Sequence, residues 1–243
     1  RNIEEQLGIE KVYFINMGTE PTSQDYINAE ETSQIKRDVA LELYVGVSDL
    51  PTMTAIKGAL EILRQGGQYR MALFTHDADA TIEEIAAMTD PSTEGYIRSP
   101  LIMIKYDRNL QARFAAKIAS TPYYMDPSRG PYRSITLDDI TELSLADANT
   151  LITAGIIPDW EHMLPLGASG LAEPIRAVST AYRTVAGERP TDANVHTRRN
   201  VDRHWRRIDE IVNAELKMND SEANLEIIRE AINGYLEMEK KAG

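Results

Sequence analysis

Cysteine is absent from this 243-residue chain. Without thiols the chain forms no disulfide, offers no thiolate metal ligand and has no thiol nucleophile. It also lacks any apolar run near the roughly 20 residues that cross a bilayer, and its first residues do not show the charged, apolar, small-residue order of a signal peptide. We therefore expect a soluble protein with no membrane partner.

The common signatures of nucleotide binding and hydrolysis are missing as well. Neither G-x-G-x-x-G nor the phosphate-binding loop occurs, and Gly167-Ala-Ser-Gly170 fails the G-x-S-x-G spacing of a nucleophile elbow. The four histidines are scattered and lack the spacing of a metal site. We therefore predict no cofactor and no metal.

Basic residues are outnumbered, with 26 Lys and Arg against 38 Asp and Glu and a net charge of -12. Nonspecific binding to nucleic acid needs a basic surface that displaces counterions from phosphates, so we expect no direct nucleic-acid partner. The hydrophobic share of 42% is typical of a folded globular protein.

The charge is distributed unevenly along the chain. Residues 1–50 hold ten acidic and four basic residues, whereas 196–207 hold five arginines and one aspartate. Such complementary regions can attract each other between copies of the chain, although a solvated acidic face and an ordinary basic helix would look the same. The candidate interface residues are Asp25, Glu30, Glu31, Arg198, Arg199, Arg203, Arg206 and Arg207.

Strand and helix patterns alternate in the first half of the chain. We expect a strand buried on both faces at Lys11–Met17, an exposed loop at 18–36 that carries the three candidate acids, and a half-covered strand at Val39–Val47. A helical stripe then includes Met53, Ile56, Leu60 and Leu63, and it ends at Gly66-Gly67.

The alternation continues with strands at Arg70–Thr75 and Pro100–Tyr106. A capping box at Thr81–Glu84 predicts a short helix between them, and Leu110, Phe114 and Ile118 mark another helix afterwards. Repeated alternation with short connections predicts an α/β fold, with a mainly parallel or mixed sheet flanked by helices.

The second half of the chain predicts a capped helix, a hairpin and two long helices. Ser144 can cap a helix that Gly155 ends, and residues 158–166 and 173–182 form a hairpin through Gly167–Gly170. The last two helices carry the apolar stripes Val201, Trp205, Ile208, Val212 and Leu216, then Leu225, Ile228, Ile232, Tyr235 and Leu236, with Asp220 or Ser221 capping the second. No linker divides the chain, so we expect one core domain over residues 1–243.

One stretch suggests catalysis. Met71–Thr75 followed by Asp77-Ala-Asp79-Ala-Thr81 resembles the first motif of haloacid-dehalogenase-like phosphatases, in which Asp77 would attack phosphorus and Asp79 would act as acid and base and help to hold magnesium. The reaction needs a lysine and a third acid, for which Lys105 or Lys117 and Asp138-Asp139 are the available residues. The alternative is two ordinary loop acids ahead of a helix.

A series of motifs in the second half resembles contractile tail sheath proteins of myovirus-type phages, archaeal tailed viruses and related injection systems. They appear in the family's order: Met125–Arg133, Ile135–Leu137, Leu145–Ile156, Ile175–Arg183, a Gly-x-x-x-Thr-Asp turn, and Ile228–Glu237 in the last helix. Together they cover about residues 100–241, and the earlier strand and helix alternation is compatible with the same family.

The resemblance implies a structural, non-enzymatic subunit. Such subunits form hexameric rings stacked helically around a tail tube, with the tube, baseplate and tail terminator proteins as partners. The implied location is the virion tail sheath, with assembly in the host cytoplasm. Terminal arms add strands to neighbouring subunits in the family, so that contacts survive contraction.

The chain departs from the family in length and at its ends. It is shorter than usual and has neither the β-rich segment after the final helix nor a convincing N-terminal arm, so we expect a fragment that lacks its arms. A phosphatase that uses Asp77 and Asp79 and a small-ligand-binding α/β module remain the alternative functions.

Overall fold

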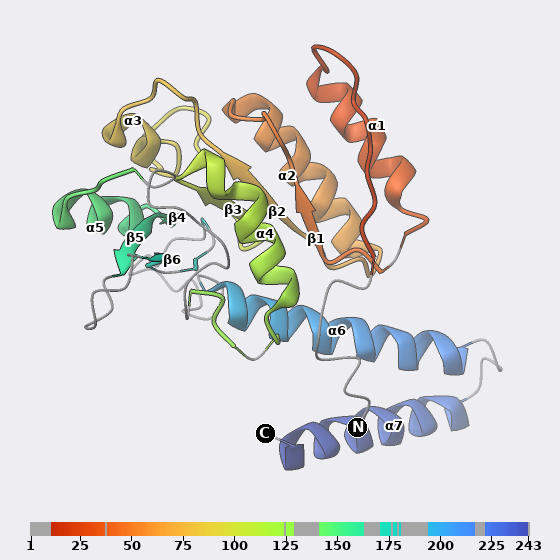
Figure 1. Cartoon of the computed structure of the whole chain (residues 1–243). Helices are drawn as coiled ribbons and strands as arrows, with labels where there is room; N and C mark the ends of the chain where they lie inside the picture. The colour runs from red at the N-terminus through yellow and green to blue at the C-terminus, as the bar shows by residue number, and fades with distance from the viewer. Residues whose placement is uncertain are drawn as a thin grey trace.

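A four-stranded parallel sheet forms the centre of the molecule, with helices on both faces (Figure 1). The computed structural model describes residues 11–36, 38–123, 125–128, 141–162, 171–175, 177–178, 180, 194–216 and 222–242. The strands lie in chain order, β1 (Leu41–Leu43), β2 (Met71–Thr75), β3 (Ile102–Lys105) and β4 (Ile156–Ile157). The predicted α/β fold with a mainly parallel sheet is confirmed.

The two central strands are buried along their whole length. In β2, Ala72 and Phe74 belong to one hydrophobic cluster, whereas Met71 and Leu73 belong to another. Successive side chains of a strand point to opposite faces, so one continuous apolar run supplies both cores. The burial of every residue in β2 and β3 therefore follows from the helices on both faces.

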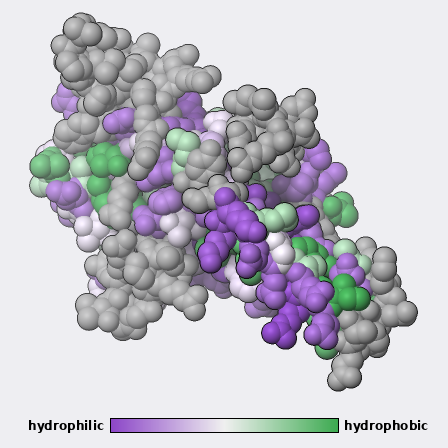
Figure 2. All heavy atoms as spheres, turned by 90° about the horizontal axis from the view of Figure 1, so that it is seen from below, coloured by the Kyte–Doolittle hydropathy of each residue, from purple (hydrophilic) through white to green (hydrophobic). Residues whose placement is uncertain are grey.

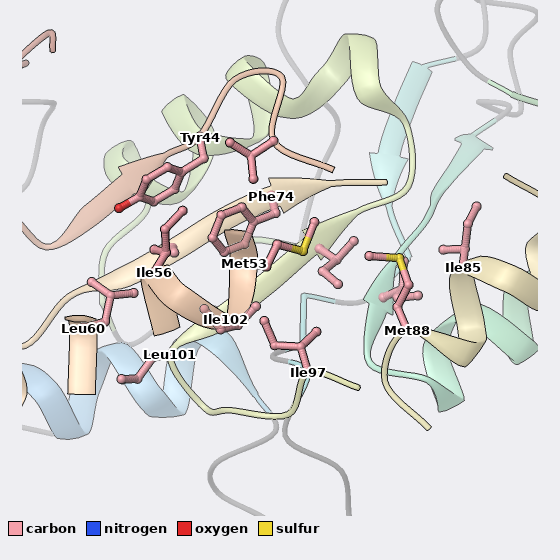
Figure 3. Close-up of a cluster of buried hydrophobic side chains, with 14 of the residues drawn as sticks. Tyr44, Met53, Ile56, Leu60, Phe74, Ile85, Met88, Ile97, Leu101 and Ile102 are labelled. Carbon is pink, nitrogen blue, oxygen red and sulfur yellow. The ribbon is translucent and has the colours of Figure 1, made fainter. Parts of the chain in front are cut away.

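The first core lies under three helices. Figure 3 shows Met53, Ile56 and Leu60 packed near Phe74 and Ile102 of the sheet. The helices that cover this face are α2 (Leu50–Gln65), α3 (Ile82–Ala87) and α5 (Leu145–Thr153). The predicted stripe of α2 is thus the one that is buried.

The ends of these helices follow the sequence signals. The Asp49 side chain accepts a hydrogen bond from the backbone N–H of Thr52 at 2.8 Å and begins α2, and Thr81 forms the predicted capping box with Glu84 at the start of α3. Gly67 follows α2 with a φ of 79°, a left-handed conformation that glycine adopts at little cost.

The predicted caps of α5 are also confirmed. The backbone N–H of Asp147 donates to the Ser144 hydroxyl at 3.1 Å, and Gly155 follows the helix with a φ of 77°. The chain then continues directly into β4.

The second core lies on the opposite face of the sheet. Phe114 and Ile118 pack there with Leu73 and Met103, and Val195 from much later in the chain joins them. Phe114 and Ile118 lie on α4 (Gln111–Ser120), and Leu110 of the preceding 3-10 helix η2 (Arg108–Leu110) belongs to the same cluster. The predicted helix and its apolar face are confirmed.

A two-stranded antiparallel sheet follows β4. It pairs β5 (Asp159–His162) with β6 (Leu171–Pro174), so the predicted hairpin pairing is confirmed, although the second strand begins before Glu173. The turn predicted at Gly167–Gly170 lies outside the described residues.

Two long helices run side by side beneath the sheet (Figure 1). They are α6 (Val195–Leu216) and α7 (Glu222–Ala242), as predicted, and the caps expected at Asp220 or Ser221 lie outside the described residues. Trp205 and Leu216, assigned to the apolar stripe of α6, are about half exposed. The buried positions of α6 are Val195, Arg198 and Asp202.

The strand predicted at Lys11–Met17 is wrong. The segment pairs with no strand among the described residues, and its side chains from Val12 to Ile15 are exposed. Lys11 and Tyr13 both bind Asp38 on the surface, at 2.9 and 3.1 Å. Apolar and aromatic residues give a segment strand propensity, but a strand also needs a hydrogen-bonded neighbour.

The loop predicted at 18–36 is also wrong, because it contains α1 (Ser23–Ser33), which lies against α2. The Thr22 side chain and Asp25 form a capping box, a signal that the sequence contains. The strand predicted at Val39–Val47 is shorter, and Val45 is exposed while Tyr44 is buried. None of the described helices has the length and apolar character that a membrane crossing requires.

Candidate subunit interface

The three candidate acids lie on α1 in different environments. Asp25 is exposed and accepts hydrogen bonds from the hydroxyl and backbone N–H of Thr22, which lower the pKa of its carboxyl. Glu31 is exposed, whereas Glu30 is only 5% exposed and contacts Tyr44 and Arg70. Of the three, Asp25 and Glu31 are available to a neighbouring molecule.

The first two candidate arginines of α6 are used within the chain. Arg198 is buried and forms an ion pair with Asp202 one turn later. Arg199 donates to the backbone carbonyl of Thr121 at 2.7 Å, and burial lowers the pKa of its guanidinium to about 10. The Arg199 contact attaches the start of α6 to the end of α4.

The other three arginines lie further along α6. Arg203 stacks 3.7 Å from the centroid of the Tyr123 ring and pairs with Glu239 of α7 at 3.2 Å. Arg206 donates to the backbone carbonyl of Tyr69 at 2.7 Å. Arg207 pairs only with its neighbour Glu210 among the described contacts, and its side chain is 57% exposed.

The arginine side of α6 therefore contacts α4, α7 and the segment before β2. Whether it also meets the acidic residues of a neighbouring molecule stays a prediction. Arg207 is the candidate whose side chain is most open to such a contact, because long-range attraction between exposed charges does not require the internal ion pairs to break.

A hydrophobic surface lies at the N-terminal segment, which the sequence interpretation placed in the core. Phe14 is 92% exposed, and Val12 and Ile15 are more than half exposed. Lys11 and Tyr13 hold the segment to Asp38 through their polar ends. An exposed run of this kind is typical of a contact surface.

The last helix carries further exposed apolar residues. They are Leu225, Ile227, Leu236 and Met238. Ile228 and Tyr235 are buried, and the Tyr235 hydroxyl lies 2.6 Å from Nδ1 of His204 on α6. Figure 2 shows this side of the molecule, where hydrophobic (green) residues lie among hydrophilic (purple) ones. The exposed residues are scattered and do not form one apolar stripe.

The phosphatase candidates that the structure describes lie in different environments. Asp77 and Asp79 are exposed in the loop after β2, where the Asp79 backbone N–H donates to the Asp77 carboxylate at 3.2 Å. Lys105 is buried against Asp159, and Lys117 is half-buried. Asp138-Asp139 lies outside the described residues. In the part of the chain that the structure describes, no three His, Asp or Glu side chains are grouped to hold a metal ion.

Sequence reasoning missed two buried polar clusters. One joins Glu30, Glu42, Tyr44 and Arg70, and the other joins Lys105, Asp107 and Asp159. An arginine directly before a buried strand and a lysine at the end of one were the visible signals, because such charges need partners when they are buried.

The strand order bears on where an α/β fold could bind a ligand. Ligands bind such sheets at a switch point, where the strand order reverses. The order β1-β2-β3-β4 contains no reversal within the described residues.

No protein-family model matches this sequence, and no curated protein sequence matches it. Solved structures do match. The sheath tail protein from Desulfitobacterium hafniense aligns with 91% of this chain at a TM-score of 0.66 and 10% identity. A chain of the anti-feeding prophage baseplate aligns with 92% at 0.62 and 15% identity, and the contracted helical sheath of that prophage aligns with 95% at 0.62 and 12% identity.

These alignments cover almost all of this chain but only part of the others. The chain spans 50% of the Desulfitobacterium protein, 60% of the baseplate chain and 62% of the contracted sheath chain. At these identities the likeness concerns the fold. The chain therefore has the fold of contractile tail sheath proteins.

Proposed function

We propose that this protein is a structural subunit of a contractile sheath that polymerises around a tail tube. The observation that carries the proposal is the alignment of 91–95% of the chain with sheath and baseplate chains at TM-scores of 0.62–0.66. Contraction would occur by rearrangement of subunits and would need no active site in this chain.

The N-terminal segment supports assembly by strand addition. Residues 11–17 have no strand partner among the described residues, although their composition favours a strand, and Phe14 projects into solvent. An extended segment of this kind gains backbone hydrogen bonds and apolar burial when it adds to the sheet of a neighbour. In this proposal the segment provides the arm that the sequence interpretation did not find.

Exposed charges would also guide the approach of neighbouring subunits. Asp25 and Glu31 on α1 and Arg207 on α6 are exposed, so attraction between neighbours would orient the subunits as they meet. The proposed assembly is a stack of hexameric rings, with the tube, the baseplate and the tail terminator as further partners. Its proposed location is the virion tail, after assembly in the host cytoplasm.

Electron microscopy of the intact protein tests the proposal. We expect rings, tubes or short sheath-like polymers, at low salt first, since screening weakens contacts between exposed charges. Monomers at every salt concentration, pH and protein concentration tried, also in the presence of the tube protein, would overturn it.

A further inference from the structure

A buried arginine attaches the end of α1 to the edge of the sheet. The Arg70 side chain is 1% exposed, and one terminal nitrogen donates to the backbone carbonyls of Ser33 and Lys36, both at 2.9 Å, and to the Gln68 side chain at 2.6 Å. The other donates to the Ser33 hydroxyl at 2.5 Å and to Glu42 of β1 at 2.6 Å. One guanidinium thus joins the end of α1, the following turn and β1.

Two carboxylates next to this arginine share one tyrosine hydroxyl. Tyr44 Oη lies within hydrogen-bond distance of Glu30 Oε1 and 2.9 Å from Glu42 Oε2. The Tyr44 ring stacks on Phe74 with centroids 4.9 Å apart, and Figure 3 shows its hydroxyl pointing away from Phe74. The packing fixes the hydroxyl between the two acids, but a hydroxyl has a single proton to donate.

Both acids can be hydrogen-bonded to the Tyr44 hydroxyl only when the cluster holds one further proton. With both acids ionised, two negative charges face one guanidinium, and Tyr44 can donate to only one of them. With one acid protonated, that acid donates to Tyr44, Tyr44 donates to the second acid, and the second acid accepts from Arg70. A buried cluster favours the arrangement in which charges balance and polar atoms are paired.

Glu30 is the acid that holds the proton. Glu42 already accepts from Arg70 at 2.6 Å, whereas Glu30 Oε2 has no hydrogen-bond partner and lies 3.6 Å from the same nitrogen. Burial, and then the nearby charge of Glu42, raise the pKa of the Glu30 carboxyl to about 7. Burial also raises the pKa of Tyr44 well above its usual value, so its hydroxyl stays protonated.

Other charged groups around α1 have partners of their own. Lys57 and Glu61 on α2 pair with each other at 3.8 Å, and Asp38 after α1 pairs with Lys11. Asp49 caps α2, and Glu31 on α1 itself is exposed. The groups that face the Glu30 carboxyl are therefore Glu42, Tyr44 and Arg70.

We propose that Glu30, Tyr44, Glu42 and Arg70 form a one-proton latch that holds α1 on the β1 edge of the sheet. Loss of the shared proton leaves two adjacent buried carboxylates and loosens α1. The inference goes beyond the proposed function and does not depend on it. It would make the position of α1, and of the exposed segment that precedes it, sensitive to pH near neutrality.

The direction of the pH dependence follows from the two environments of the Glu30 carboxyl. In the docked state the pKa is raised to about 7, whereas an undocked α1 exposes the carboxyl to water and returns it towards 4.5. The contribution of Glu30 therefore favours docking of α1 most below about pH 4.5. Docking weakens as the pH rises from about 4.5 to about 7, and above that Glu30 causes no further change.

Hydrogen exchange of the α1 amides, residues 23–33, tests the latch between pH 5 and 8 after correction for the intrinsic exchange rates. In the wild type we expect the opening of α1 to increase about tenfold or more between pH 5.5 and 7. Glu30→Gln keeps the shape of the protonated acid and should remove this dependence. Glu31→Gln, on the exposed side of the same helix, is the matched control and should behave like the wild type.

A titration of the unmodified protein decides the matter even if Glu30→Gln does not fold. Carbon NMR of labelled glutamate carboxyls should show one group with a midpoint near pH 7, far above exposed glutamates. Midpoints below about pH 5 for every glutamate would overturn the proposal. So would a flat exchange profile in the wild type, or the same profile in Glu30→Gln.

Discussion

Lys105 and Asp159 form an ion pair in which neither side chain is exposed to solvent. The pair joins the end of β3 to the start of β5, and the Lys105 ammonium also donates to the backbone carbonyl of Ile157 at 3.1 Å. Burial raises the pKa of Asp159 to about 6 although Lys105 opposes the shift, and burial lowers the pKa of Lys105. The hairpin is thus attached to the main sheet through two charges that depend on each other.

Removal of one partner should destabilise the protein strongly. Asp159→Asn leaves a buried ammonium without its counter-charge, at an expected cost of about 3–5 kcal/mol in the free energy of unfolding. The double variant Lys105→Met, Asp159→Asn should recover part of that loss, because no buried charge remains. Urea unfolding of the two variants measures both values, and a double variant less stable than Asp159→Asn alone would contradict this account.

Glycine at position 67 is required by the turn after α2. Its φ is 79°, and a Cβ at this position would lie 3.0 Å from the carboxylate Oδ2 of Asp209 on α6. Gly67→Ala should therefore lower the free energy of unfolding by about 1–2 kcal/mol. Gly58→Ala is the matched control, since Gly58 lies inside α2 with open space at its Cβ, and it should stabilise the protein by about 0.5–1 kcal/mol.

Thr22 should stabilise the first turn of α1. Thr22→Ala removes the capping box with Asp25 and should cost about 1 kcal/mol, chiefly as faster hydrogen exchange in α1. Thr19→Ala, in the exposed segment just before, should have almost no effect. Equal effects of the two substitutions would mean that the capping box does not stabilise the helix.

Phe14 should matter to assembly and not to folding. Phe14→Asp replaces a side chain that already faces water, so the free energy of unfolding should change by less than about 0.5 kcal/mol. If residues 11–17 add to a neighbouring sheet, the concentration needed for polymers should rise at least about tenfold. Val45→Asp, at another exposed apolar position, is the control. Normal polymers of Phe14→Asp by electron microscopy would exclude this role.

Asp77→Asn should leave the protein unaltered. The residue is exposed and its carboxylate accepts a local hydrogen bond from the Asp79 backbone N–H, which an amide oxygen can also accept, so stability should change by less than about 0.5 kcal/mol. We expect no magnesium-dependent hydrolysis of p-nitrophenyl phosphate by either form. Hydrolysis by the wild type that is lost in Asp77→Asn would instead support the phosphatase.

The central part of the fold could be predicted because its elements follow local rules. A continuous apolar run such as Met71–Thr75 predicts a strand covered on both faces, and Thr81, Ser144 and Gly67 mark helix ends. These features depend on residues close together in the sequence, so a single sequence suffices to read them.

The edge of the fold could not be predicted in the same way. Helix α1 buries Glu30 and shows no apolar stripe. It is held in place by Arg70, which lies 37 residues after Ser33. Lys105 and Asp159 are 54 residues apart. Contacts between distant polar residues leave no periodic pattern, and the same holds for the interface candidates Arg198 and Arg206, which bind within their own chain.

The two attachments of α6 determine how a force on α7 would pass through the protein. Arg199 binds the end of α4 and Arg206 binds the segment before β2, and the two positions are about 10 Å apart along the helix. A helix attached at two positions tilts less under load than a helix attached at one end. A pull on α7, which Arg203 joins to α6, would therefore be shared between α4 and the segment before β2.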